Sequence, residues 1–372
     1  MHVGRNHEEY KNVELFVNGW SVTTVDNFQA GGMECEDILE ENIELSHIES
    51  ERYLGQIISS DSKNKRNILK LKNKGIGIQN KIINMLHTMS GGIFYFQIAL
   101  IYRCAYLLSS ILTSSEVWYG ITQAEYEQLE SADQILIKNI FQCSSSVPTE
   151  IQFLELGIWP IRFIIMKRRC LYLHHILQQS ENSLLFRFFY AQLKYPQHGD
   201  WVSQIFIDLN QLNIEEGLEE IQTMSFKKYV SILDKQIGNL ALKWLLDKKN
   251  SRKSENAKGK QLNYTELKMA DYLLPSDTDL TIEEKKWIFK CRIDDIDVRA
   301  NRRWQYEDLS CLSCNSNKAE SQIHILECKP LLENSNILTY LPNYSDLFGN
   351  DLDELIYVAR LLKDNFDRRI VE

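Results

Sequence analysis

Four residues near the C-terminus have the types and the spacing of a metal site. Two residues separate Cys311 from Cys314, nine more precede His324, and a further three precede Cys328. A Cys-x2-Cys turn can aim both thiolates at one point, and His-x3-Cys places two donors one helical turn apart, so the four ligands can converge tetrahedrally. With four protein ligands no position stays open for water, which predicts structural zinc and not a catalytic metal. The alternative is three unrelated reduced cysteines.

The redox state of the cysteines bears on this choice. The first residues form no apolar signal segment, so we expect an intracellular protein, cytoplasmic or nuclear, whose eight cysteines stay reduced and favour metal binding over disulfides. The longest apolar run, residues 93–112, approaches the length of a membrane span, but Arg103 lies at its centre. A charge there costs about 2.5–3.5 kcal/mol on insertion scales. We therefore expect a buried core helix and no membrane partner.

Composition indicates an ordered globular chain with an uneven charge distribution. Of its 372 residues 44% are hydrophobic and 25% charged, with only 6 Pro and 16 Gly, which excludes collagenous, mucin-like and wholly disordered proteins and predicts two or three domains. The net charge of −9 does not indicate a nucleic-acid-binding protein. That total averages opposed segments, because residues 34–51 carry −8 and residues 61–83 carry +6.

The basic segment has the pattern of an amphipathic helix. Apolar or small residues recur at spacings of three or four and predict one apolar stripe: Ile68, Leu71, Gly75, Ile78, Ile82 and Leu86. The other faces carry Lys63, Lys65, Arg66, Lys70, Lys72, Lys74 and Lys81. Such a row of cations could follow a phosphate backbone or could be a solvated outer face, and the sequence leaves both open. The same choice applies to a second cluster, Arg162, Lys167, Arg168 and Arg169.

Most of the remaining chain is predicted to be helical. Asn18-Gly19 between two β-prone runs predicts a hairpin, and residues 53–58 read as a further short strand. Two capping boxes, Thr122 with Glu125 and Thr281 with Glu284, predict helix starts. Pro160 is predicted to be the first residue of another helix. Ser225 and Asn350 are predicted caps, and the helix that Asn350 caps is expected to run through residue 365. The basic, polar segment 250–262 is predicted to be a linker.

The order of these features resembles the C-terminal part of LINE-type (non-LTR) retrotransposon reverse transcriptases, especially the Dong-like arthropod branch. The end of a palm segment is matched by Met1–Gly4, and a primer grip by Tyr53, Leu54 and Gly55 with Ile57-Ile58. A thumb is matched by 67–77, Arg103, 112–116, Trp118 and Tyr119, and the segment behind it by 154–157, 160–162, Arg168 and Arg169. A CCHC motif is matched by Cys311, Cys314, Ser321-Gln322, His324 and Cys328. It covers most of the chain and is loosest in 178–262 and after 330.

The resemblance implies a mainly α fold with a small β remnant of a polymerase palm. Its implied domains are a palm remnant (1–60), a helical thumb (61–180), a helical connector (181–249), the linker (250–262) and a C-terminal helical unit (263–372) that holds the zinc motif (311–328). In this family the thumb grips a template–primer duplex, so Lys63, Lys65, Arg66, Lys70, Lys74 and Lys81 are expected to contact the RNA or DNA backbone.

The family's catalytic Tyr/Phe-x-Asp-Asp hairpin has no counterpart in this sequence, and two-metal phosphoryl transfer requires those carboxylates. We therefore expect a truncated polymerase without catalytic residues of its own, with the missing palm and fingers polypeptide as a further partner. The alternative function is that of an inactive remnant or a helical protein-interaction module without a nucleic-acid role, which the net charge and the acidic segment 34–51 favour.

Overall fold

The computed structural model is mainly helical, as the sequence predicts. The structure describes residues 15–17, 20–22, 50–53, 56–59, 64–89, 92–196, 199–251, 259, 261–275, 280–302, 305, 307–314, 317–333, 343–349 and 351–369. The chain divides into two units, one of residues 1–74 with 121–129 and one of residues 75–120 with 130–372. The domain boundaries predicted at residues 60, 180, 249 and 262 stay predictions.

Two short antiparallel hairpins lie in the N-terminal part. β1 (Leu15–Val17) pairs with β2 (Trp20–Val22), which confirms the hairpin predicted around Asn18-Gly19, two residues that lie outside the described ones. β3 (Ser50–Tyr53) pairs with β4 (Gln56–Ser59), and Tyr53 is opposite Gln56. The single strand predicted over residues 53–58 is therefore wrong. A run of β-prone residues does not reveal where the chain reverses, whereas the observed pairing requires reversal between Tyr53 and Gln56.

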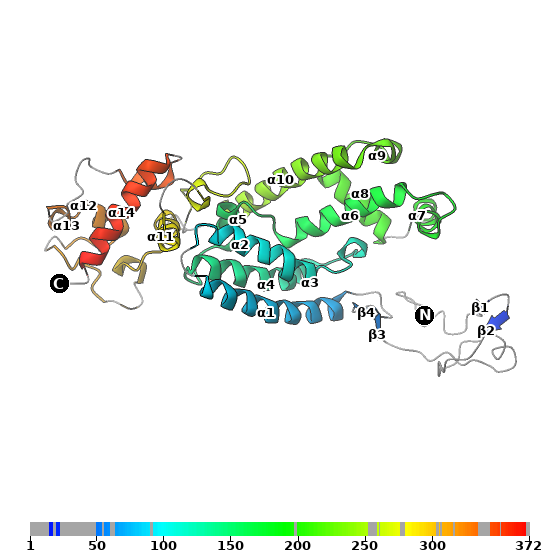
Figure 1. Cartoon of the computed structure of the whole chain (residues 1–372), viewed down its shortest axis with the longest axis horizontal. Helices are drawn as coiled ribbons and strands as arrows, with labels where there is room; N and C mark the ends of the chain where they lie inside the picture. Colours follow the sequence, from blue (N-terminus) through cyan, green and yellow to red (C-terminus); the bar gives the residue numbers. More distant parts are fainter. Residues whose placement is uncertain are drawn as a thin grey trace. The chain divides into compact units, whose positions relative to one another are not determined.

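Residues 65–88 form one long helix, α1 (Lys65–Thr88; Figure 1). This helix has an apolar stripe, as its sequence predicts. Ile68, Leu71, Ile82 and Leu86 are buried and Ile78 is half-buried, while the basic residues Lys65, Arg66, Lys74 and Lys81 are exposed. Gly75 lies on the same stripe, where a Cβ atom would come within 3.0 Å of the Ile111 side chain, so a larger residue would push the packing apart. Burial of one face fixes the opposite, basic face toward solvent.

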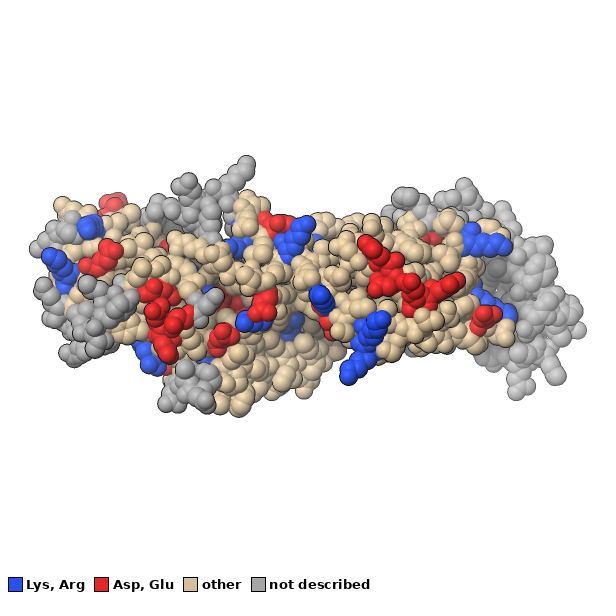
Figure 2. All heavy atoms as spheres, turned by 90° about the horizontal axis from the view of Figure 1, so that it is seen from above, with Lys and Arg blue, Asp and Glu red and all other residues tan. Residues whose placement is uncertain are grey.

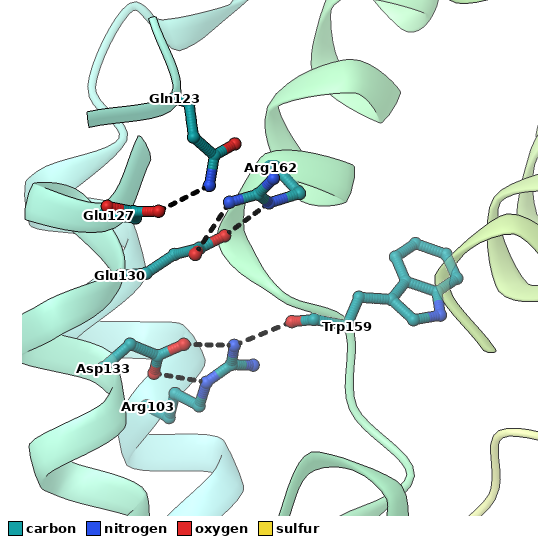
Figure 3. Close-up of polar contacts among 7 residues, drawn as sticks. All are labelled: Arg103, Gln123, Glu127, Glu130, Asp133, Trp159 and Arg162. Carbon is teal, nitrogen blue, oxygen red and sulfur yellow. Dashed lines mark hydrogen bonds and ion pairs between the residues drawn. The ribbon is translucent and has the colours of Figure 1, made fainter. Parts of the chain in front are cut away.

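The apolar run 93–112 is helical and partly buried. It forms α2 (Tyr95–Tyr102), a π-helical turn (Arg103–Leu108) and α3 (Ser109–Ile111). The buried Arg103 guanidinium donates to both carboxylate oxygens of Asp133 at 2.7 Å and to the Trp159 carbonyl at 2.9 Å (Figure 3). Its charge is thus compensated inside the protein. None of the described helices is long and apolar enough to cross a membrane.

Further helices follow along the chain, and those within residues 161–250 share one packed core. Their bounds are α4 (Gln123–Phe141), α5 (Thr149–Leu156), α6 (Ile161–Leu177), α7 (Leu184–Lys194), α8 (Trp201–Gln211), α9 (Leu218–Thr223) and α10 (Phe226–Asn250). α6 lies against α8, α9 and α10 (Figure 1). Apolar side chains of these helices belong to one buried cluster. The predicted caps Thr122 and Ser225 are confirmed by their hydrogen bonds to backbone N–H groups. Pro160 is the cap residue of α6 and not its first helical residue.

The C-terminal part carries α11 (Ile282–Arg292), α12 (Gln322–Glu327), α13 (Lys329–Glu333) and α14 (Leu352–Arg369). The predicted capping box of Thr281 and Glu284 is confirmed. Asp351 accepts from the backbone N–H groups at the start of α14, whereas the predicted cap Asn350 lies outside the described residues. α14 also continues to Arg369, beyond the predicted end at 365. In these last turns the half-buried Phe366 ring packs against the Trp287 ring of α11, and i,i+4 ion pairs join Lys363 to Asp367 and Asp364 to Arg368.

Candidate functional site

The structure brings the four predicted metal ligands together. Cys311 and Cys314 lie in a loop closed by the backbone bridge between Ser310 and Ala319, and His324 projects from α12. The Cys311 and Cys328 sulfurs are 4.0 Å apart, and Cys314 Sγ lies 3.3 Å from His324 Nε2. All four ligand atoms lie within 4.8 Å of one another. Ligands of a tetrahedral zinc ion, with Zn–S of about 2.3 Å, are separated by about 3.5–3.8 Å, so the donor set fits such an ion.

Hydrogen bonds outside the ligand set hold this geometry. Ser321 caps α12 by accepting the His324 backbone N–H at 3.1 Å, which orients the helix that carries the histidine. The buried carboxylate of Glu320 accepts from the Leu312 N–H, between the two loop cysteines, at 3.4 Å and from the Arg299 N–H at 3.1 Å. Sequence reasoning missed Glu320, because a single acid in a polar loop gives no sign of burial.

Burial favours the neutral thiol form of two of the ligands, Cys311 and Cys328. Burial raises the pKa of the Cys328 thiol to about 12, and the neighbouring Cys311 adds to this effect. Burial also raises the pKa of Cys311, against the opposing effect of a hydrogen bond from the Ser313 backbone N–H. A bound divalent cation reverses this direction because it deprotonates the thiols that coordinate it. That backbone N–H already favours the thiolate form that a metal requires.

The predicted nucleic-acid contacts lie along α1. Lys65, Arg66, Lys74 and Lys81 are exposed and Lys70 is half-buried, while Lys63 lies outside the described residues. The helix has 24 residues, of which six are Lys or Arg and none is Asp or Glu. Its basic face is therefore not balanced by acids of the same helix.

The basic cluster on α6 has a different environment. The Arg169 guanidinium donates to both oxygens of Asp208, at 2.6 and 2.9 Å, in a fully buried pair. Arg162 makes a two-pronged contact with Glu130 of α4, at 2.9 and 3.1 Å (Figure 3).

The other two basic residues of this cluster also have internal partners. Lys167 forms an ion pair with Asp234 of α10, and Arg168 donates to the Leu112 carbonyl. The sequence leaves two interpretations open for this cluster, a phosphate-binding surface and a solvated face. The structure supports neither of them, because these residues join α6 to neighbouring parts of the fold.

The remaining predicted site is only partly described. Tyr53 ends β3, and Leu54 and Gly55 lie outside the described residues, as do most of the acidic residues of segment 34–51. The described surface has an acidic region of its own at α9 and the turn before it (Figure 2), formed by Glu215, Glu216, Glu219 and Glu220.

No protein-family model, curated protein or solved structure matches this chain.

Proposed function

We propose that this chain is related to the C-terminal part of LINE-type reverse transcriptases and binds the backbone of an RNA–DNA template–primer duplex through α1. The observation that carries the proposal is the charge of this helix, six cations without an acid, combined with the burial of its apolar face. A helix anchored in this way presents its cations in a fixed row. Because phosphate contacts carry no base information, the binding is not sequence-specific.

The physical basis of this binding is counterion release. Each Lys or Arg that neutralises a phosphate frees condensed ions from the nucleic acid, so affinity depends steeply on salt. The exposed residues Lys65, Arg66, Lys74 and Lys81, with the half-buried Lys70, are the proposed contacts.

The proposal is tested by charge reversal with a matched control. The α1 variant changes Lys65, Arg66, Lys70 and Lys74 to Glu; the α10 variant changes Lys227, Lys228, Lys235 and Lys243, four exposed lysines of another long helix, to Glu. Both variants alter the net charge equally. We expect the α1 variant to lose at least about 100-fold in affinity for an RNA–DNA duplex at moderate salt, and the α10 variant far less. Equal losses, or no loss, would refute the assignment.

We propose further that Cys311, Cys314, His324 and Cys328 hold one structural zinc ion. The convergence of the four donor atoms supports this, and bound zinc would stabilise a segment with a small core. Metal analysis of the purified protein should find one equivalent of zinc, and Cys314→Ser should lose it. The exposed Cys104, changed to Ser, is the matched control and should keep the metal. Folded protein without metal would end this proposal.

A further inference from the structure

Helix α7 exposes a second apolar face. Its Phe186 and Phe189 are buried where α7 packs against α6 and α8. On the opposite side Leu184 is 82% exposed and Phe188 61% exposed, with Ala191 one further turn along. The spacing of four and then three residues places these three side chains in one stripe along the helix. Single exposed apolar residues are ordinary, whereas an aligned stripe is typical of a surface that contacts another helix.

An apolar cavity adjoins this stripe. It has a volume of about 360 Å³ and is lined by Leu185, Phe188 and Gln192 of α7, together with Tyr172, Trp201 and Val117. Its aromatic wall is rigid, because Trp201 Nε1 donates to the Glu116 carbonyl at 2.8 Å and the Tyr172 ring meets the Trp201 ring edge-on at 5.8 Å. A preformed aromatic pocket beside an exposed stripe resembles the sites that receive the anchor side chain of a partner.

The basic residues beside the stripe indicate which kind of partner is complementary to it. Arg187 and Lys194 are exposed three and ten residues after Leu184, so both flank the same side of the stripe. α7 contains no Asp or Glu, and the side chain of Arg187 donates to the Glu181 carbonyl and the Asn182 amide oxygen, not to a carboxylate. Two copies of α7 facing each other would bring like charges together. A helix with acidic flanks is the complementary partner.

We propose that this α7 groove, formed by Leu184, Phe188, Ala191 and the adjoining cavity, docks an amphipathic helix of another protein. One large apolar side chain of that helix fills the cavity, and its acidic flank faces Arg187 and Lys194. The surface lies on residues other than those of α1, so the proposal holds whether or not α1 binds nucleic acid.

The test uses two synthetic fluorescent peptides, stapled as helices, that share apolar residues at i, i+4 and i+7. One carries Glu and the other Lys at the flanking positions, and binding to the full chain is measured by fluorescence anisotropy. We expect the Glu peptide to bind at least about 10-fold more tightly than the Lys peptide. Equal binding of the two peptides, or binding of neither, overturns the proposal.

Variants locate the site. Phe188→Ser should lower the affinity for the Glu peptide by at least about 10-fold, because the cavity that receives the anchor side chain loses one of its walls. The double variant Arg187→Glu with Lys194→Glu should invert the preference in favour of the Lys peptide. Ile207→Ser on α8, a residue that is also half-exposed, is the matched control and should bind as the unaltered chain does. Retained preference in the double variant overturns the proposal.

Two further measurements distinguish other occupants. Sedimentation velocity shows whether the stripe pairs with a second copy, and flotation with phosphatidylserine–phosphatidylcholine vesicles shows whether it meets a lipid surface. The proposal expects neither to change between the unaltered chain and Phe188→Ser. Self-association or vesicle binding that Phe188→Ser abolishes would overturn it.

Discussion

Helices α1 and α6 carry similar groups of basic residues but use them differently. On α6, Arg169 and Arg162 are paired with Asp208 and Glu130 from other helices, whereas α1 has no acid of its own and exposes most of its cations. The comparison shows that a count of Lys and Arg along a helix does not identify a phosphate-binding face. On α6, acids that neighbouring helices supply pair with the cations and hold them within the fold.

The largest stability effect is expected at the most buried pair of α6. Asp208→Ala leaves the Arg169 guanidinium, which is 2% exposed, without its carboxylate. An uncompensated buried charge destabilises by about 3–5 kcal/mol. Urea unfolding followed by circular dichroism measures this loss in the free energy of unfolding. A loss below about 1 kcal/mol would mean that water reaches the arginine and would break the contrast with α1.

A smaller effect is expected at Arg162, which is more accessible. Arg162→Ala removes both contacts to the buried Glu130 and the stacking of the guanidinium on Trp244, whose ring centre is 4.4 Å away. We expect a loss of about 2–3 kcal/mol, between the values for buried and surface pairs. Arg162→Lys should recover only part of it, because an ammonium cannot make the two-pronged contact. Full recovery in the same urea assay would argue that only the charge matters.

Lys167 is the most exposed of the three basic residues of α6 compared for stability. Its side chain is 25% exposed and that of its partner Asp234 is 44% exposed, so solvent screens the pair. Lys167→Ala should change the free energy of unfolding by about 0–1 kcal/mol, and 1 M salt should remove the difference. A larger loss than for Arg162→Ala would contradict the dependence on burial.

The smallest stability effect is expected on α1. Lys65→Ala and Lys81→Ala remove exposed side chains from a helix, and each should alter the free energy of unfolding by no more than about 0.5 kcal/mol. The same changes should weaken RNA–DNA duplex binding, since phosphate contacts are lost. A variant that loses stability but keeps its duplex affinity would place that lysine with the structural cations of α6.

The features that could be predicted from the sequence are those that the spacing of nearby residues determines. The apolar stripe of α1 follows from a period of three or four residues, and the convergence of Cys311, Cys314, His324 and Cys328 follows from the reach of a tight turn and one helical turn. Both depend on residues close in the chain.

What could not be predicted depends on residues far apart in the chain. Arg169 meets Asp208 39 positions later, and nothing in either local sequence indicates the other. The hairpin at Tyr53 was missed because strand propensity does not mark the chain reversal. The apolar pattern of α7 suggested neither the buried Phe189 nor the exposed Phe188, because both faces are apolar and only packing distinguishes them.

The salt dependence of duplex binding tests the central claim most directly. The slope of log K against log salt concentration counts the phosphates that cations neutralise, and each lost contact should reduce its magnitude by about one. Anisotropy titrations from 50 to 300 mM NaCl should therefore show a slope smaller by about four for the variant with Glu at Lys65, Arg66, Lys70 and Lys74, and a nearly unchanged slope for the α10 variant. Equal slopes for the unaltered chain and the α1 variant would contradict the assignment of the basic face of α1 to nucleic-acid binding.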